Sequence, residues 1–235
     1  LTRGADGVRL FEIGRRYLAD DERATVGIVL AGEGRARGWA SGKAQAFDAY
    51  DVKGDVLALL GAAGVPIDNL QVMGDAGAWF HPGQSGTLRL GPKTVLASFG
   101  ALHPATAQAF DLEGAVIAAE VYLDALPARR AGGPVRRVFD PSELQPVQRD
   151  FAFLVPEALA ADALVRAVRG ADKASIVNAR VFDRFVGSGV PEGQVSLAIE
   201  VTLQPVAQSF TEDALAAIAG KIVTAAARLG ARLRG

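Results

Sequence analysis

Three side chains between residues 183 and 196 combine the chemical groups that bind an unstacked nucleic-acid base. Asp183 and Phe185 have the same parity at the end of one predicted strand, and Ser196 lies on the polar side of the next. An aromatic ring stacks on a base, a carboxylate accepts hydrogen bonds from base N–H groups, and a hydroxyl can donate or accept. If the two strands pair through the turn between them, we expect the three side chains to form one patch on an open sheet face.

A structural interpretation of the same residues competes with this hypothesis. Phe185 would then belong to the hydrophobic core, and Asp183 would cap the turn at residues 187–193. Phe151 and Phe153 also alternate on a predicted strand, but the Lys/Arg-Gly-Phe-Gly-Phe signature of RNA-recognition motifs is absent. We therefore interpret these two rings as mostly core.

The sequence offers no set of residues suited to covalent or metal chemistry. It contains no cysteine and only two histidines, which cannot build a zinc site without several carboxylates. His81 and His103 each precede a proline, which favours extended or turn backbone, and no neighbouring Ser or Cys forms a nucleophile–base signature. We predict that both are structural turn residues and that the chain carries neither catalytic residues nor a metal site.

Composition restricts the class of protein further. Half of the 235 residues are hydrophobic, which is enough for a buried core, and the formal net charge is −1. With that charge, a surface that follows many RNA phosphates is not expected. No apolar run approaches the ~20 residues that span a bilayer, and the lack of cysteine fits a reducing cytoplasm. Because the sequence starts with Leu1 and not Met, we expect a fragment of a longer cytoplasmic protein without membrane contact.

The second half of the sequence predicts six short elements in the order βαββαβ. Residues 195–203 alternate apolar and polar side chains, so one face of this strand is expected to be buried. Gly170 is predicted to follow the end of the first helix, and Thr211 to cap the second. The elements are strands at 150–155, 176–185, 195–203 and 231–233 and helices at 159–169 and 212–229. This order is typical of the ferredoxin-like fold, with both helices on one face of the sheet.

The first half predicts strands with fewer helices, so the chain as a whole is expected to be α+β. Strands are predicted at 8–14, 24–31, 87–90, 94–99 and 115–123, and helices from a cap at Asp51 and at 105–110. Trp39 and Trp79 lie near Gly-rich turns, where a core role is favoured over an inter-subunit contact. Residues 131–141 are rich in Gly, Pro and charge, which predicts a linker between domains at 1–130 and 142–235.

Short motifs along the whole chain resemble the phenylalanyl-tRNA synthetase β-chain family. No single motif is specific, but their number and order are. Departures from the family pattern are Gln148 in place of a basic residue, Phe185 in place of Tyr, and Val195 in place of Lys. The motifs are Leu10-Phe11-Glu12-Ile13-Gly14, Tyr50-Asp51-Val52-Lys53-Gly54-Asp55, His81-Pro82-Gly83-Gln84-Ser85, Gly100-Ala101-Leu102-His103-Pro104, Arg149-Asp150, Phe182-Asp183, Pro191-Glu192-Gly193, Phe210-Thr211-Glu212 and the C-terminal run Gly230 to Arg234.

The resemblance implies a fold and a function for each half. The first half would be an antiparallel α/β scaffold like a class II synthetase core but inactive, since residues 98–104 lack the arginine that clamps ATP phosphates in active relatives. The second half would be a ferredoxin-fold anticodon-binding domain in which Asp183, Phe185 and Ser196 contact the anticodon.

The resemblance also implies the partners. The whole enzyme would be an (αβ)₂ heterotetramer that joins phenylalanine to tRNA(Phe) with ATP and Mg²⁺. Its active site would lie on the α chain, and this fragment would bind neither ATP nor Mg²⁺. Two alternatives from other classes stay open: a general RNA-binding module, and a structural or small-ligand-binding ferredoxin-like protein.

Overall fold

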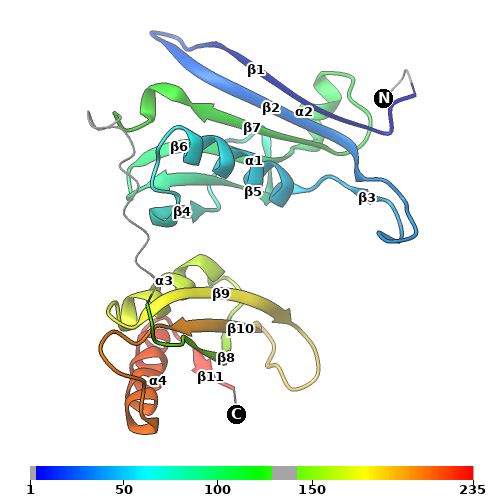
Figure 1. Cartoon of the computed structure of the whole chain (residues 1–235). Coiled ribbons are helices and arrows are strands. Elements are labelled where there is room, and N and C mark those ends of the chain that lie inside the picture. Colours follow the sequence, from blue (N-terminus) through cyan, green and yellow to red (C-terminus); the bar gives the residue numbers. More distant parts are fainter. Residues whose placement is uncertain (1–3, 129–141, 235) are drawn as a thin grey trace. The chain divides into compact units, whose positions relative to one another are not determined.

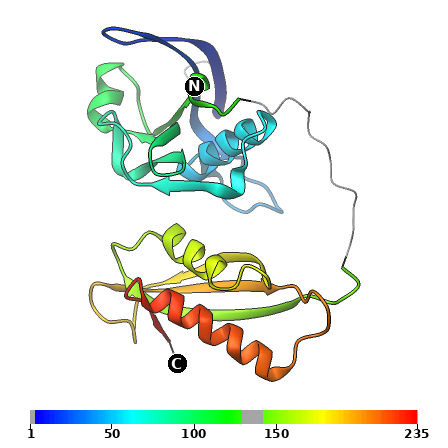
Figure 2. The same cartoon turned by 90° about the vertical axis from the view of Figure 1, so that its left-hand side faces the viewer.

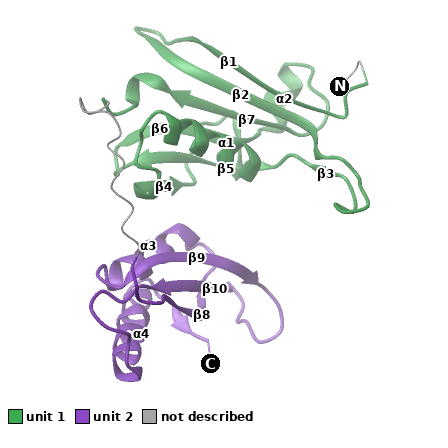
Figure 3. Ribbon diagram, viewed as in Figure 1, with its two compact units in different colours: residues 1–136 green, residues 137–235 purple. Residues whose placement is uncertain are grey.

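Two separate hydrophobic cores organise the chain, one in each half of the sequence. The computed structural model describes residues 4–128 and 142–234. It divides the chain into two compact units, residues 1–136 and 137–235, which we call unit 1 and unit 2 (Figure 3). The predicted linker at 131–141 lies outside the described residues, so the predicted domain boundaries stay predictions.

An antiparallel sheet forms the frame of unit 1 (Figure 1). The strand order is β1-β2-β7-β6-β5-β4, and the short β3 pairs with the end of β2. Strands β5 and β6 form a hairpin, as the predicted pairing of residues 87–90 with 94–99 required, whereas β2 pairs with the distant β7. The strands are β1 (Gly7–Tyr17), β2 (Glu22–Arg35), β3 (Gln45–Ala46), β4 (Leu70–Met73), β5 (Phe80–Leu90), β6 (Thr94–Leu102) and β7 (Val116–Tyr122).

Helix α1 (Ala49–Ala62) covers part of one face of this sheet. Its buried residues Val52, Val56 and Leu60 recur every four positions and enter the core with strands β2, β6 and β7. The prediction that Asp51 caps this helix was wrong by three residues. Asp48 is the cap, because its carboxylate accepts the N–H groups of Tyr50 and Asp51 at 2.7 and 3.1 Å, while Asp51 accepts the Asp48 N–H at 2.8 Å.

The remaining elements of unit 1 are short. They are η1 (Ile67–Asn69), α2 (Pro104–Ala109) and η2 (Leu123–Ala125). Strands β1 and β2 are longer than predicted, since their polar ends continue the backbone pairing as far as Tyr17 and Glu22. The core interpretation of Trp39 was wrong, because this residue is fully exposed in the turn between β2 and β3. Trp79 is 42% exposed, and its ring lies 6.1 Å from that of Phe80.

Unit 2 has the predicted βαββαβ order and the ferredoxin-like strand order β11-β8-β10-β9. Every strand pair is antiparallel. Apolar residues from both helices pack on the same face of the sheet, and the two helices lie against each other (Figure 2). The elements are β8 (Val147–Pro156), α3 (Ala161–Ala171), β9 (Ile176–Phe185), β10 (Gln194–Leu203), α4 (Glu212–Ala227) and β11 (Arg232–Leu233).

The helix ends of unit 2 match the prediction in one case and differ in the other. Thr211 caps α4, since its hydroxyl accepts the Ala214 N–H at 3.2 Å, as predicted. Gly170 was predicted to follow α3 but lies inside it, because the helix continues to Asp172, which accepts the Ser175 N–H at 3.2 Å. None of the helices in the described part of the chain combines the length and apolar composition that crossing a bilayer requires.

An ion pair at the end of α3 predicts a pH dependence of stability. Lys221 Nζ on α4 donates to Asp172 Oδ2 at 2.8 Å. This hydrogen bond, opposed by desolvation and helped by the Ser175 N–H, holds the pKa of Asp172 below its usual value. A lowered folded-state pKa stabilises the fold above the ordinary carboxyl value of ~4, and the stabilisation disappears as the pH falls through the folded-state pKa.

We expect Asp172→Asn to lower the free energy of unfolding of unit 2 at pH 7 by about 1 kcal/mol, because Lys221 is largely solvated. The loss should shrink as the pH is lowered to about 2, because the wild-type carboxylate takes up a proton as the pH falls through its lowered folded-state pKa. Urea unfolding at both pH values measures this, with the exposed Glu192→Gln as the control. An equal loss at both pH values would mean that packing, and not charge, sets the effect.

Candidate functional site

One face of the unit 2 sheet is turned away from both helices. In β10, the buried residues Val195, Leu197, Ile199, Val201 and Leu203 point into the core with α3 and α4. The side chains between them, from Ser196 to Thr202, therefore point to the opposite face. We call this opposite side the open face.

A β-bulge at Phe182 places Asp183 and Phe185 on the open face. The first residue of β9, Ile176, is buried and pairs with Leu203, and a register shift between Thr202 and Leu203 leaves Val177 as an extra residue. Beyond this shift, Ala179 and Val181 pair with the inward-pointing Val201 and Ile199, so odd-numbered residues in the middle of β9 lie on the core side. The register shifts between Ala198 and Ile199, which leaves Phe182 as an extra residue on β9. Beyond it, Asp183 pairs with Ala198 and Phe185 with Ser196, on the opposite side of the sheet. The bulge thus decides against Phe185 as a core residue.

The three residues predicted from the sequence lie at one end of the open face. Phe185 and Ser196 are direct cross-strand neighbours. Asp183 pairs with Ala198, which is the next pair on the same face. The same transverse row continues to Leu154 on β8 and Arg232 on β11. One row of side chains therefore crosses all four strands, with the aromatic ring at one edge and a guanidinium at the other.

The Phe185 ring is half-exposed and has two close neighbours. The ring is 41% exposed, and the Arg234 guanidinium carbon lies 5.5 Å from its centroid. Arg234 is anchored through its backbone N–H, which donates to the Ala152 carbonyl at 2.7 Å. Sequence reasoning missed Arg234 as a site residue. The available signal was its place in the C-terminal run, but only the sheet order brings it across to β9.

Ser196 is less accessible than the sequence suggested. It was expected on an open polar face, but it is only 5% exposed. Its neighbours in the row are the larger side chains Phe185 and Leu154, which flank it on both sides. A ligand would reach this hydroxyl only at the edge of the Phe185 ring. Asp183, in contrast, is exposed.

The charges on the open face are largely balanced. Arg180 makes a bidentate ion pair with Glu200, with N–O distances of 2.9 and 3.1 Å. Arg232 and Arg234 make no ion pair with any other residue that the structure describes in unit 2. Near Phe185 the site therefore offers the exposed Asp183 carboxylate and the Arg234 guanidinium, while Arg232 lies at the other edge of the sheet.

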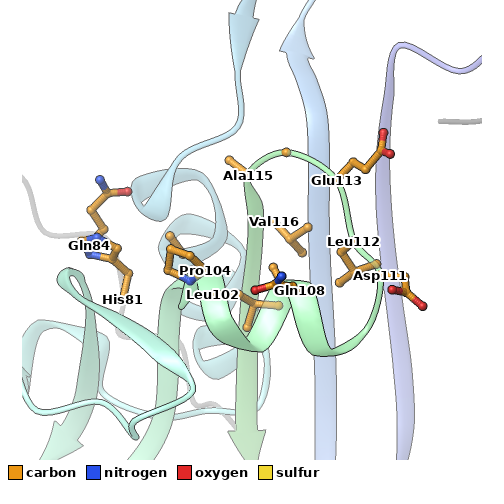
Figure 4. Close-up of a pocket in the computed structure, with 13 residues that line it drawn as sticks. His81, Gln84, Leu102, Pro104, Gln108, Asp111, Leu112, Glu113, Ala115 and Val116 are labelled. Carbon is orange, nitrogen blue, oxygen red and sulfur yellow. The ribbon is translucent and has the colours of Figure 1, made fainter.

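Unit 1 contains a pocket of about 550 Å³ between α2 and the segment that contains His81 (Figure 4). Its floor is apolar, and Asp111 and Glu113 belong to its lining. Both histidines act locally: His81 Nδ1 accepts the Gly83 N–H at 3.1 Å, and His103 Nδ1 accepts the Ala105 N–H at 3.2 Å. His103 caps α2, and His81 lies in β5, so the predicted place in a turn is wrong for His81. Among the described residues, no three His, Asp or Glu side chains gather closely enough to hold a metal ion.

The strand next to this pocket excludes a side chain at Gly100. A Cβ atom there would overlap the backbone of Gln84 and Ser85, and the backbone has a φ of 142°. Gly100 lies within the segment 98–104, which contains no arginine. A side chain at position 100 would require the backbone of Gln84 and Ser85 to shift.

Comparison with known proteins gives matches to both units. The model described as phenylalanyl tRNA synthetase beta chain CLM domain matches residues 1–123, and the ferredoxin-fold anticodon binding domain matches residues 142–234. The whole chain is 63% identical to a phenylalanine–tRNA ligase beta subunit of Novosphingobium aromaticivorans, of which it covers 30%. It is 54% identical over 99% of its length to the one of Zymomonas mobilis, covering 29% of it. The chain thus spans somewhat under a third of these relatives.

The close approach of Gly187 to Phe185 generates a structural prediction. A Cβ atom at Gly187 would lie 2.9 Å from Cζ of the ring, so Gly187→Ala should displace the ring from Arg234 while the sheet stays folded. NMR contacts between the Phe185 ring and the Arg234 side chain should weaken. The control is Gly220→Ala, where a Cβ atom meets nothing within 4 Å. Unchanged contacts in the Gly187 variant would show that the ring is not held against the turn.

Proposed function

The chain belongs to the phenylalanyl-tRNA synthetase β-chain family, and we propose that unit 2 binds the anticodon of tRNA(Phe) through the open face around Phe185. The observation that carries this proposal is the bulge at Phe182, which moves a ring and a carboxylate out of the core and beside a hydroxyl. The match of residues 142–234 to an anticodon-binding domain supports it.

Each group has a distinct part in binding an anticodon base. The Phe185 ring provides a stacking platform that accepts any base. Arg234 lies over one face of this ring, so an incoming base stacks on its planar guanidinium or displaces it. The Asp183 carboxylate accepts hydrogen bonds from base N–H groups and so distinguishes between bases. Ser196 contributes a hydroxyl at the ring edge.

The balance of charge favours contacts with bases over contacts with phosphates. Residues 142–234 contain ten Lys and Arg and ten Asp and Glu, so their formal charge is zero. A neutral domain gains little from counterion release along an RNA backbone. Its binding therefore depends on a few base contacts and on the rest of the ligase, which holds the domain near the anticodon.

We expect Phe185→Ala to weaken tRNA(Phe) binding by the complete ligase by about 1–3 kcal/mol, the usual cost of losing one stacking ring. Asp183→Ala should cost no more than this and should relax discrimination at one anticodon position. Ser196→Ala should cost least. The KM for tRNA measures these losses, while amino-acid activation should not change.

The matched control for these variants is Val177→Ala, an exposed residue at the other end of β9. Melting temperature checks the fold of each variant. A Phe185 variant with an unchanged tRNA KM, or with a large drop in melting temperature, would contradict the proposed platform.

For unit 1 we propose an inactive scaffold related to the class II synthetase core. Its antiparallel sheet with one helix on a face is compatible with such a scaffold. The collision at Gly100 and the arginine-free lining of the neighbouring pocket support the loss of ATP binding. In the complete ligase, ATP and Mg²⁺ would then act on the α chain.

The 235-residue chain should therefore show no phenylalanine-dependent exchange of pyrophosphate into ATP. The reason is the missing arginine clamp, without which the developing phosphate charge is not neutralised. The assay uses the purified chain with phenylalanine, ATP and Mg²⁺, and the complete ligase serves as the positive control. Turnover above that of a reaction without enzyme would overturn the scaffold proposal.

An uncovered apolar strip suggests where unit 1 contacts the α chain. Helix α1 packs on β6, β7 and β2, but its contact with β1 is slight. Phe11 and Ile13 on β1 are consequently 74% and 66% exposed, although they pair with the buried Ile28 and Val26. A groove of about 390 Å³ runs between this strip and α1. We propose that the α chain of an (αβ)₂ ligase covers the strip, in keeping with the beta subunit names of the relatives.

The double variant Phe11→Asp, Ile13→Lys should reduce the amount of α chain that co-purifies with the full-length β chain at least tenfold, because two charges would be buried without partners. The control is Val206→Asp, an exposed apolar residue of unit 2. Size-exclusion chromatography of the co-expressed chains measures the assembly. Full retention of the α chain by the double variant would mean that another part of the β chain covers β1.

A further inference from the structure

The turn between β2 and β3 exposes a tryptophan among three cations. Trp39 is 101% exposed, which means that its indole touches almost nothing. Arg35, Arg37 and Lys43 surround it in the sequence, and residues 34–47 contain no Asp or Glu. None of the three cations forms an ion pair with another described residue of unit 1. We call residues 35–44 the Trp39 loop.

The Trp39 loop is a closed turn whose backbone is hydrogen-bonded. Gly38 and Gly42 exchange backbone hydrogen bonds of 3.2 and 2.8 Å, and Ser41 Oγ donates to the Ala36 carbonyl at 3.1 Å. At its base Arg35 pairs with Gln45 across β2 and β3. Figure 1 shows the loop projecting from the end of β2, away from the sheet of unit 1. The fold therefore presents the indole to solvent on an ordered support.

The charge of the loop is opposite to that of the described residues of unit 1. Residues 4–128 contain ten Lys and Arg and fifteen Asp and Glu, a formal charge of −5. Without the three cations of the Trp39 loop, the remaining formal charge would be −8. The loop is thus a local positive site among described residues that are otherwise acidic, although Arg3, Arg129, Arg130 and Arg136 bring the formal charge of residues 1–136 to −1. An anionic ligand would be attracted to the loop more than to the described residues around it.

We propose that the Trp39 loop is a second RNA-contact site, in which Trp39 stacks on an unpaired base and the three cations neutralise neighbouring phosphates. An aromatic side chain beside unpaired cations is the combination that binds single-stranded nucleic acid. A protein partner would have to supply matching carboxylates for all three cations, whereas an RNA strand supplies a phosphate at every nucleotide. The Trp39 loop proposal rests on the proposed function in one respect, which is that the RNA is identified as tRNA.

The test measures RNA binding by the 235-residue chain. Trp39 and Trp79 are its only tryptophans, so a Trp79→Phe background makes Trp39 the sole indole reporter. Titration with a tRNA(Phe) transcript, and separately with a single-stranded oligouridylate, should quench its fluorescence. The Trp39→Ala variant lacks the reporter indole, so its binding is measured with labelled RNA. It should bind about 5- to 100-fold more weakly, the range for one lost stacking contact. Trp39→Phe should keep most of the affinity.

Salt dependence tests the cations separately. The triple variant Arg35→Gln, Arg37→Gln, Lys43→Gln should lower the slope of log K against log salt by about 2, because each neutralised phosphate on a single strand contributes about 0.7.

Phe185→Ala serves as the reference for the anticodon site. If only Phe185→Ala weakens tRNA binding, the Trp39 proposal fails while the proposed function stands. If only the loop variants weaken tRNA binding, the anticodon proposal fails and the Trp39 proposal stands.

A protein contact would give a different pattern. Loop variants that bind RNA within twofold of wild type but release the α chain from the complete ligase would overturn the proposal and assign the loop to the subunit interface. Because the loop is exposed, all variants should keep the wild-type melting temperature.

Discussion

The β-bulge at Phe182 determines which side of the unit 2 sheet carries Phe185, and the candidate site depends on it. After a first register shift beside Val177, the middle of strand β9 has Ala179 and Val181 in the core, and the same alternation continued without a second shift would send Phe185 the same way. One extra residue reverses the alternation, so that the ring lies beside Ser196 on the open face. The hydrophobic core of unit 2 stays covered, because residues of α3 and α4 pack on the other face of the sheet. A bulge near the end of a strand thus exposes an aromatic side chain without opening the core.

The two units divide the task of binding in a way that their charges explain. Unit 2 has no net charge, so its open face suits a few specific base contacts and contributes little long-range attraction. The described residues of unit 1 are acidic except at the Trp39 loop, and the uncovered strip on β1 is apolar. In the proposed ligase, unit 1 is held by another subunit, and unit 2 needs only modest affinity because the assembly raises its effective concentration at the anticodon.

The sequence predicted the elements of unit 2 well because each had a strong local signal. The alternation of residues 195–203, the Thr211 cap and the order βαββαβ all reflect short-range rules. The bulge has no such signal, since Phe182 fits the strand pattern as well as its neighbours do. Ser196 was placed on the correct face, but its burial depends on Phe185 and Leu154 across two strand pairs. Gly170 lies inside α3 because Asp172, two residues later, ends the helix. Trp39 was assigned to the core because it is large and apolar, yet the turn that carries it leaves it fully exposed.

The central claim is that the Phe185 ring stacks on an anticodon base, and NMR of the complex tests it most directly. The 235-residue chain, with its phenylalanine rings selectively labelled, would be mixed with a tRNA(Phe) anticodon stem-loop at low salt. The account predicts intermolecular contacts between the Phe185 ring protons and the protons of one anticodon base, together with an upfield shift of the ring signals from stacking. Contacts from the RNA to other surfaces of unit 2, with the Phe185 signals unchanged at saturation, would contradict it.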